Sequence, residues 1–217
     1  MPKHAFRGLA VILALTLLMV FTAVPVLAFD ARSGDIVTVA GGEEVNDDLY
    51  VSADTIVIDG TINGDLWAIA RIISVNGPVN GSVTVAGQTV NIRGDVDHAL
   101  RAAAQTINID GNVTGDVMVG CSDVNIASTA KIGGDILFGT GIARIDGLIE
   151  GDIKGYGSEV TIGNGVHGTV DLEIDNLTIL PAANIGGDLS YTSKEEADIQ
   201  SGAQIAGTTT HNLPPVK

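Results

Sequence analysis

Aliphatic residues recur along this chain with a period of seventeen residues, and within each repeat they alternate with polar or small residues. We count positions in each repeat from an anchor that is usually glycine. The anchors are Asp47, Gly64, Gly81, His98, Gly115, Gly134, Gly151, Gly168, Gly187 and Gly207, with two residues inserted before Gly134 and Gly187 and three before Gly207. A constant period of this length is typical of a solenoid.

The positions two residues before the anchor, and two, nine and eleven residues after it, are almost always Val, Ile or Leu. The first of these series has no exception and runs Val45, Ile62, Val79, Val96, Val113, Ile132, Ile149, Val166, Ile185, Ile205. Alternation with a period of two predicts short strands that bury one face. β-Branched side chains are favoured on such a surface.

A repeat of seventeen residues is too short for a strand, a helix and two loops, so the pattern predicts an all-β fold. We expect a single-domain parallel β-helix of about nine coils, stacked about 4.8 Å apart into a rod about 45 Å long. Six residues after each anchor the side chain is small, from Ala53 to Gly157, as a tight corner requires.

The pattern divides the chain into four segments. Residues 1–28 combine Lys3 and Arg7 with an apolar run from Leu9 to Val24 and a small-residue cleavage site. This predicts a signal helix for export, with an uncleaved N-terminal membrane anchor as the alternative. Residues 29–44 are expected to form a partial first coil or cap, residues 45–207 the β-helix and residues 208–217 a disordered tail.

Composition and charge narrow the class of protein. Aromatic residues make up only 4% of the 217 residues, and 28 residues are glycine, which suits a narrow solenoid filled by Val and Ile. The formal net charge is -15. A surface this acidic repels phosphate backbones, so we expect no nucleic-acid partner.

The single cysteine, Cys121, excludes an internal disulfide framework. It falls in the series of small corner residues, where a small buried structural residue is expected. A reactive thiol or an intermolecular disulfide is the alternative interpretation.

Aspartate recurs one residue after the anchor, and the series is Asp48, Asp65, Asp116, Asp135, Asp152 and Asp188. Stacked carboxylates could bind Ca²⁺. Aspartate after glycine also commonly bonds to turn backbone, and the glycine-rich nonapeptide of calcium β-rolls is missing. Both interpretations are open at this point.

The turns of the repeat read G-x-[IV]-x-G-D-[LIV] at residues 60–66, 111–117 and 147–153. Over residues 45–207 the chain resembles the bactofilins, a polymer-forming cytoskeletal family, and among them the signal-bearing envelope type. The resemblance implies a right-handed parallel β-helix whose coils polymerise end to end without nucleotide, often at a membrane.

An apolar stripe is expected on the outer surface, three and five residues after the anchors. Its members are Tyr50, Trp67, Ile69, Met118, Leu137 and Tyr156, with Ala86 and Ala103 between them and Arg101 and Lys154 among them. A contiguous apolar patch favours a self-association surface. The first segment or the tail of the chain could instead cover the stripe.

The sequence therefore predicts a non-enzymatic scaffold protein of the cell envelope that polymerises end to end with copies of itself, because both ends of an open solenoid present unpaired backbone groups. We expect it to meet the membrane or envelope through its N-terminal segment. No catalytic, metal or cofactor residues are expected, because His98 and His167 lie four coils apart and no long loop interrupts the coils. The alternative is an exported binding module for cell-wall polysaccharide or for a protein partner.

Overall fold

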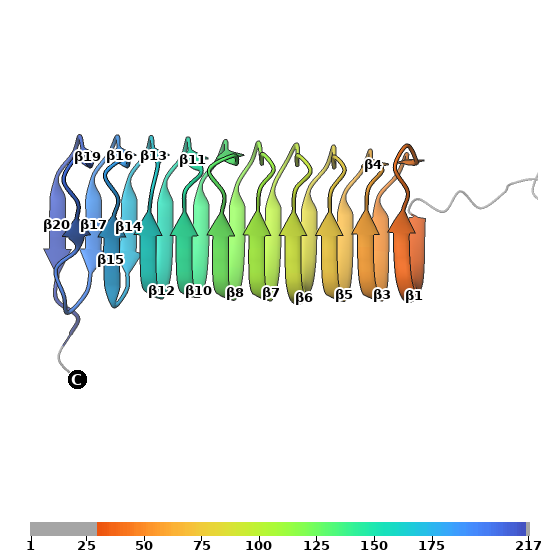
Figure 1. Ribbon diagram of the computed structural model, residues 1–217, viewed down its shortest axis with the longest axis horizontal. Helices are drawn as coiled ribbons and strands as arrows, with labels where there is room; N and C mark the ends of the chain where they lie inside the picture. Colours follow the sequence, from red (N-terminus) through yellow and green to blue (C-terminus); the bar gives the residue numbers. More distant parts are fainter. Residues whose placement is uncertain (1–29, 216–217) are drawn as a thin grey trace, which may run out of the picture.

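The computed structural model describes residues 30–215, which form a parallel β-solenoid with its coils stacked in a straight row (Figure 1). Each regular coil contains one strand of ten residues. These long strands are β1 (Asp30–Val39), β3 (Leu49–Ile58), β5 (Leu66–Val75), β6 (Val83–Ile92), β7 (Leu100–Ile109), β8 (Val117–Ile126), β10 (Ile136–Ile145) and β12 (Ile153–Ile162). No helix occurs among residues 30–215, and so none that is long and apolar enough to cross a membrane.

Shorter strands complete the coils. At the C-terminal end the long strand is divided into pieces, namely β14 (Val170–Glu173), β15 (Asn176–Ile179), β17 (Leu189–Thr192), β18 (Asp198–Ile199) and β20 (Thr209–Asn212). Two-residue strands form another side of the coils, namely β2 (Glu44–Val45), β4 (Thr61–Ile62), β9 (Lys131–Ile132), β11 (Leu148–Ile149), β13 (Gly165–Val166), β16 (Asn184–Ile185) and β19 (Gln204–Ile205). Isolated bridges connect β4 to β9 along that side.

Each long strand bends once, at the corner that follows its fifth residue. In β3 the pairing with β5 runs from Leu49 to Ser52 and resumes at Thr55, and other pairs skip the position of Asp54 in the same way. We call the part before the corner the first limb and the part after it the second limb. Together with the short strands the two limbs make a coil with three sides.

The register places equivalent residues directly over one another. Val79 bridges Val96, and Val96 bridges Val113, in parallel, and all three are fully buried. One hydrophobic core runs from Val37 to Tyr191 without interruption. The all-β parallel solenoid with a seventeen-residue period is therefore confirmed.

The aspartate column holds successive coils together. In each case the Oδ1 atom accepts a hydrogen bond from the backbone amide of the equivalent residue in the next coil, at 2.6 to 2.9 Å. The acceptors are Asp48, Asp65, Asp116, Asp135, Asp152 and Asp188. This confirms the interpretation in which the carboxylates bond backbone, and it explains why the aspartate follows a turn glycine.

The glycine anchors leave room for these carboxylates. A Cβ at Gly64, Gly81, Gly134, Gly151, Gly168 or Gly207 would overlap the aspartate Oδ1 atom of the preceding coil. The one internal anchor that is not glycine is His98, and the coil before it has Ser82 in place of the aspartate. The glycine and the aspartate of the repeated motif are therefore coupled across two coils.

Four expectations about the extent of the solenoid need correction or lie outside the structure. The path β1-β3-β5-β6-β7-β8-β10-β12-β14-β17-β20 contains eleven strands, so there are more coils than the nine predicted. The first coil has a complete long strand, β1, and residues 209–212 form β20 on β17 instead of a disordered tail. The predicted signal helix at residues 1–28 lies outside the described residues.

Candidate functional site

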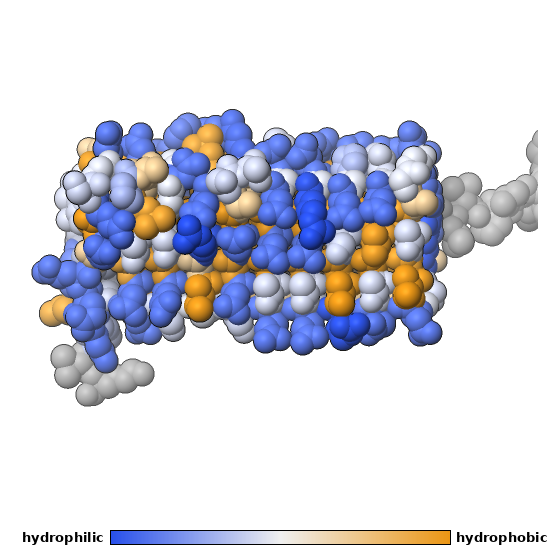
Figure 2. Space-filling view, in the orientation of Figure 1, coloured by the Kyte–Doolittle hydropathy of each residue, from blue (hydrophilic) through white to orange (hydrophobic). Residues whose placement is uncertain are grey.

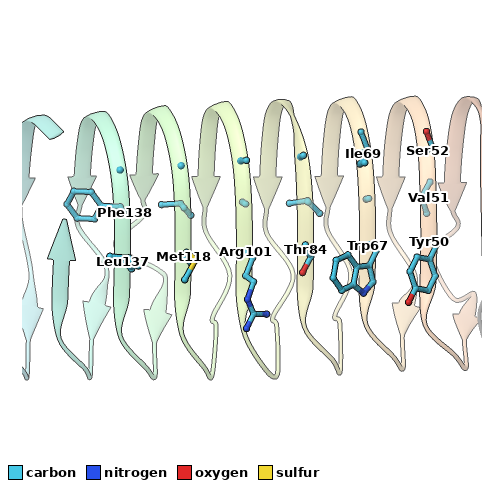
Figure 3. Close-up of a pocket in the computed structure, with 18 of the residues that line it drawn as sticks. Tyr50, Val51, Ser52, Trp67, Ile69, Thr84, Arg101, Met118, Leu137 and Phe138 are labelled. Carbon is cyan, nitrogen blue, oxygen red and sulfur yellow. The ribbon is translucent and has the colours of Figure 1, made fainter. Parts of the chain in front are cut away.

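A shallow apolar groove runs along the outer surface of the first limbs, from β1 to β12. Figure 2 shows a different side of the rod, that of the second limbs, on which hydrophilic side chains alternate with apolar ones. The groove consists of two neighbouring outward columns, because side chains three and five residues after the anchor point away from the core on each first limb. Figure 3 shows the row of Tyr50, Trp67, Thr84, Arg101, Met118 and Leu137, which forms the first column.

The predicted stripe residues all line this groove, but they belong to different columns. Tyr50, Trp67, Met118 and Leu137 lie in the first column, whereas Ile69 and Tyr156 lie in the second. They are exposed by 38% (Leu137) to 66% (Ile69). The rings of Tyr50 and Trp67 stack with their centroids 6.2 Å apart and an angle of 5° between their planes.

The centre of the second column is hollow. Between Ile69 and Tyr156 this column contains only Ala86, Ala103, Gly120 and Gly139. A Cβ at either glycine would meet nothing within 4 Å. The whole groove, lined from Ala31 to Tyr156, has a volume of about 1050 Å³.

The groove contains no carboxylate, although the chain has 26 acidic residues. Along both columns from β1 to β12 every outward residue is apolar, small, hydroxyl-bearing or basic, and the first acids are Asp171 and Glu173 on β14. Lys154 forms an ion pair with Asp171 at 3.6 Å. Arg101 has no ion pair or hydrogen bond among the described residues, so its charge is available to a ligand.

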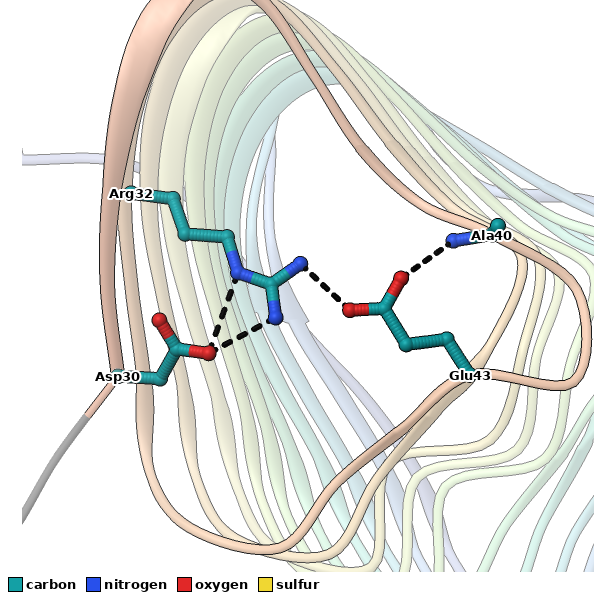
Figure 4. Close-up of polar contacts among 4 residues, drawn as sticks. All are labelled: Asp30, Arg32, Ala40 and Glu43. Carbon is teal, nitrogen blue, oxygen red and sulfur yellow. Dashed lines mark hydrogen bonds and ion pairs between the residues drawn. The ribbon is translucent and has the colours of Figure 1, made fainter.

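The N-terminal end of the core is closed by charged side chains. Asp30 and Arg32 occupy the inward positions that Leu49 and Val51 occupy in the next coil. Figure 4 shows the Arg32 guanidinium bridging Asp30 on one side of the coil and Glu43 on the other, with both ion pairs at 2.8 Å. Inward charges on an edge strand discourage pairing with another chain.

The carboxylate of Glu43 is held in its ionised form. Its Oε2 atom accepts a hydrogen bond from the backbone amide of Ala40 at 3.1 Å. This bond, followed by the bond to Arg32, lowers the pKa of Glu43 from its ordinary value. The hydrogen bond to Asp30 raises the pKa of Arg32. The charged closure of this end is therefore intact at neutral pH.

The C-terminal end of the core is closed by polar side chains. On β20 the inward residues are Thr209 and His211, opposite Leu189 and Tyr191 of β17. The ring of His211 stacks on Tyr191 with centroids 4.6 Å apart, and its Nε2 atom lies 2.9 Å from the carbonyl oxygen of Ser193. Both ends of the rod thus resemble the polar terminal repeats that keep solenoids soluble.

Other polar candidates have structural partners. The Sγ atom of Cys121 lies 3.4 Å from Thr140 Oγ1 in the corner column, and burial raises the pKa of this thiol. His167 Nδ1 pairs with Glu150 at 2.5 Å, and Lys131 pairs with the same carboxylate at 2.6 Å. Among residues 30–215 no group of three His, Cys, Asp or Glu side chains is placed to bind a metal ion.

Sequence reasoning missed two features of these surfaces. It identified the large members of the groove, but not the hollow at Gly120 and Gly139, because the absence of a side chain gives no hydropathy signal. It also treated residues 29–44 as a partial coil, because Asp30 and Arg32 break the aliphatic series. Charged residues at core positions of a terminal repeat were the available signal.

The arrangement can bind a surface of complementary shape. Comparison with protein-family models, with curated proteins and with solved structures finds no match to this chain.

Proposed function

We propose that this chain is an exported, non-enzymatic structural protein, a rod of the cell envelope that associates with further copies of itself through the groove on its first limbs. The observation that supports this proposal best is the acid-free groove on an otherwise strongly acidic chain. Copies of a chain with a net charge of -15 repel one another, so a groove without carboxylates is where two copies can approach most closely. A contiguous apolar surface of this extent is typical of an interaction site.

Association along the side of the rod is better supported than association end to end. Stacking at the ends would have to cover the ion pairs of Arg32 with Asp30 and Glu43 at one end and the polar β20 at the other. Burying charges away from water is costly unless new partners replace the solvent. The proposal keeps one implication of the bactofilin resemblance, that the chain is a self-associating scaffold of the envelope. The end-to-end polymers and the right-handed coil that the resemblance also implies are not needed for association through the groove.

Sedimentation velocity over a range of concentrations tests the proposal. We expect the sedimentation coefficient of the purified protein to rise with concentration, and we expect Trp67→Asp to abolish that rise. Ile72→Asp is the matched control, because Ile72 lies on the same strand but on the second limb, between Thr55 and Thr89. A wild-type protein that stays monomeric at high concentration, or a Trp67→Asp variant that associates normally, would contradict the proposal.

A binding module for cell-wall polysaccharide is the second candidate function. The adjacent and exposed rings of Tyr50 and Trp67 favour it, because aromatic faces commonly pack against apolar sugar faces. Sedimentation of the protein with purified cell-wall sacculi distinguishes the two functions. Binding that is lost in Trp67→Asp, in a protein that does not self-associate, would favour the binding module.

Export is part of the proposal and rests on residues 1–28. The mass of the native protein gives the position of its first residue. Cleavage after Ala28 is expected for a signal peptide, and a chain that retains Lys3 and Arg7 would indicate the membrane anchor instead.

A further inference from the structure

We propose that two copies dock antiparallel and face to face through the groove, with a two-fold axis that passes between β6 and β7. This inference rests on the proposed self-association and specifies its geometry. In such a pair each outward column faces the same column of the second copy in reverse order. The opposed strands are then β6 with β7, β5 with β8, β3 with β10 and β1 with β12.

The second column is self-complementary in this register. Its order from β3 to β12 is Ser52, Ile69, Ala86, Ala103, Gly120, Gly139 and Tyr156. Reversal places Ile69 of one copy over Gly120 of the other, where a side chain has open space. It also places Tyr156 over Ser33 and Ser52 over Gly139. Each large side chain thus faces a small one, as close packing of an interface requires.

The first column is complementary in chemistry. Tyr50 faces Leu137 of the second copy and Trp67 faces Met118, so aromatic rings meet an aliphatic side chain and a thioether. Arg101 faces the hydroxyl group of Thr84, so no two like charges are opposed within this column. The unpartnered guanidinium and the four exposed apolar residues of this column all gain contacts.

Neighbouring registers are less favourable because they oppose like charges or large side chains, or shorten the interface. Moving the axis onto β7 places Arg101 against Arg101 of the second copy, and moving it one further step places Ile69 against Tyr156. Moving the axis onto β6 removes Tyr156 from the interface. In a parallel pair each coil would face the equivalent coil of the second copy. The large side chains of Trp67 and Ile69 would then meet each other, and the hollow around Gly120 would face another hollow and stay unfilled.

The size of the contact fits a reversible dimer. Eight strands, β1 to β12, at about 4.8 Å spacing and five residues of width give a patch about 34 Å by 17 Å, a footprint of roughly 570 Å² per copy. This is somewhat below the roughly 800 Å² per partner of a standard stable interface. We therefore expect a dimer whose population depends on protein concentration.

Disulfide trapping tests the register. In a Cys121→Ala background, Ser52→Cys and Gly139→Cys are combined in one chain. The two positions are five coils apart, about 24 Å, which is far beyond the span of a disulfide within one copy. In the proposed dimer each new cysteine faces the other type of cysteine in the second copy. Mild oxidation should convert most of the protein into a covalent dimer at concentrations where the wild type is dimeric.

The matched control combines Ser52→Cys with Gly120→Cys. This pair is one coil out of register, and it should cross-link several-fold more slowly. Equal or faster cross-linking of the control, or no cross-linking of Ser52→Cys with Gly139→Cys in a protein that sedimentation shows to be dimeric, would overturn the register but leave self-association standing. A chain that never dimerises would overturn both proposals.

Discussion

The coupling between anchor glycines and the aspartate column predicts that Gly151→Ala destabilises the rod strongly, although the change adds a single methyl group. The new Cβ would lie 2.5 Å from the carbonyl oxygen of Gly134 and would overlap Asp135 Oδ1. That oxygen accepts the hydrogen bond from the amide of Asp152 at 2.8 Å. Either the carboxylate leaves this bond or the backbones of two coils move apart.

The magnitude follows from these two responses. Crowding a packed contact by one methyl group costs about 1–3 kcal/mol. Losing a hydrogen bond to a charged acceptor costs about 1.5–3 kcal/mol, and Asp135 is solvent-exposed, so the lower part of this range applies. Because the two responses partly replace each other, we expect a loss of about 2–4 kcal/mol in the free energy of unfolding.

Urea denaturation followed by far-UV circular dichroism measures this loss. Gly139→Ala is the control, because its Cβ meets nothing within 4 Å, and its effect should lie within about 1 kcal/mol of zero. At His98 a side chain at the anchor follows a coil with Ser82 in place of the aspartate. Combining Asp135→Ser with Gly151→Ala gives the same combination, so the double variant should be more stable than the sum of the two single effects predicts. Equal losses for Gly139→Ala and Gly151→Ala would refute the reasoning.

Three further predictions concern other sites. The amide of Ala40 lowers the pKa of Glu43, so the stability that this carboxylate adds is present above its ordinary pKa of 4.5 and is lost as the pH falls through its lower folded value. Glu43→Gln should therefore make the thermal unfolding temperature less sensitive to acid. An unchanged pH profile of that temperature would contradict this. Gly155→Ala should cost about 1–3 kcal/mol in urea denaturation, because its Cβ would overlap the ring of Phe138, and Phe138→Leu in the same chain should restore part of the loss, whereas no rescue would argue against the overlap. The thiol of Cys121, whose pKa burial raises, should react with iodoacetamide more slowly in the native protein than in urea, and equal rates would show that it is not protected.

The fold could be predicted from the sequence because every coil repeats the same inward positions. An unbroken aliphatic series such as Val79, Val96 and Val113 has few explanations other than stacking. The end coils could not be predicted in the same way, since Asp30 and His211 occupy core positions with residues that a hydropathy pattern excludes. Their positions became clear only from the pairing of β1 with β3 and of β20 with β17.

The groove was predictable in part. Trp67 and Tyr156 stand out in the sequence as apolar residues at outward positions, and both line the groove. Their relation to Gly120 and Gly139 depends on which column each residue belongs to and on the space above each glycine. The hydrogen-bond partner of each aspartate in the column could not be predicted from the sequence either. That partner is a backbone amide, which almost every residue type has.

The aspartate bond always runs from one coil to the coil that follows it, and six of the anchor glycines lie against the carboxylate of the coil before them. A coil can therefore be added or removed without damage only when the inserted or deleted segment starts and ends at equivalent positions of the repeat. Gain or loss of a whole seventeen-residue unit would change the length of the rod in increments of about 4.8 Å and keep every joint intact. Gain or loss of a few residues at an anchor would instead break a joint on each side.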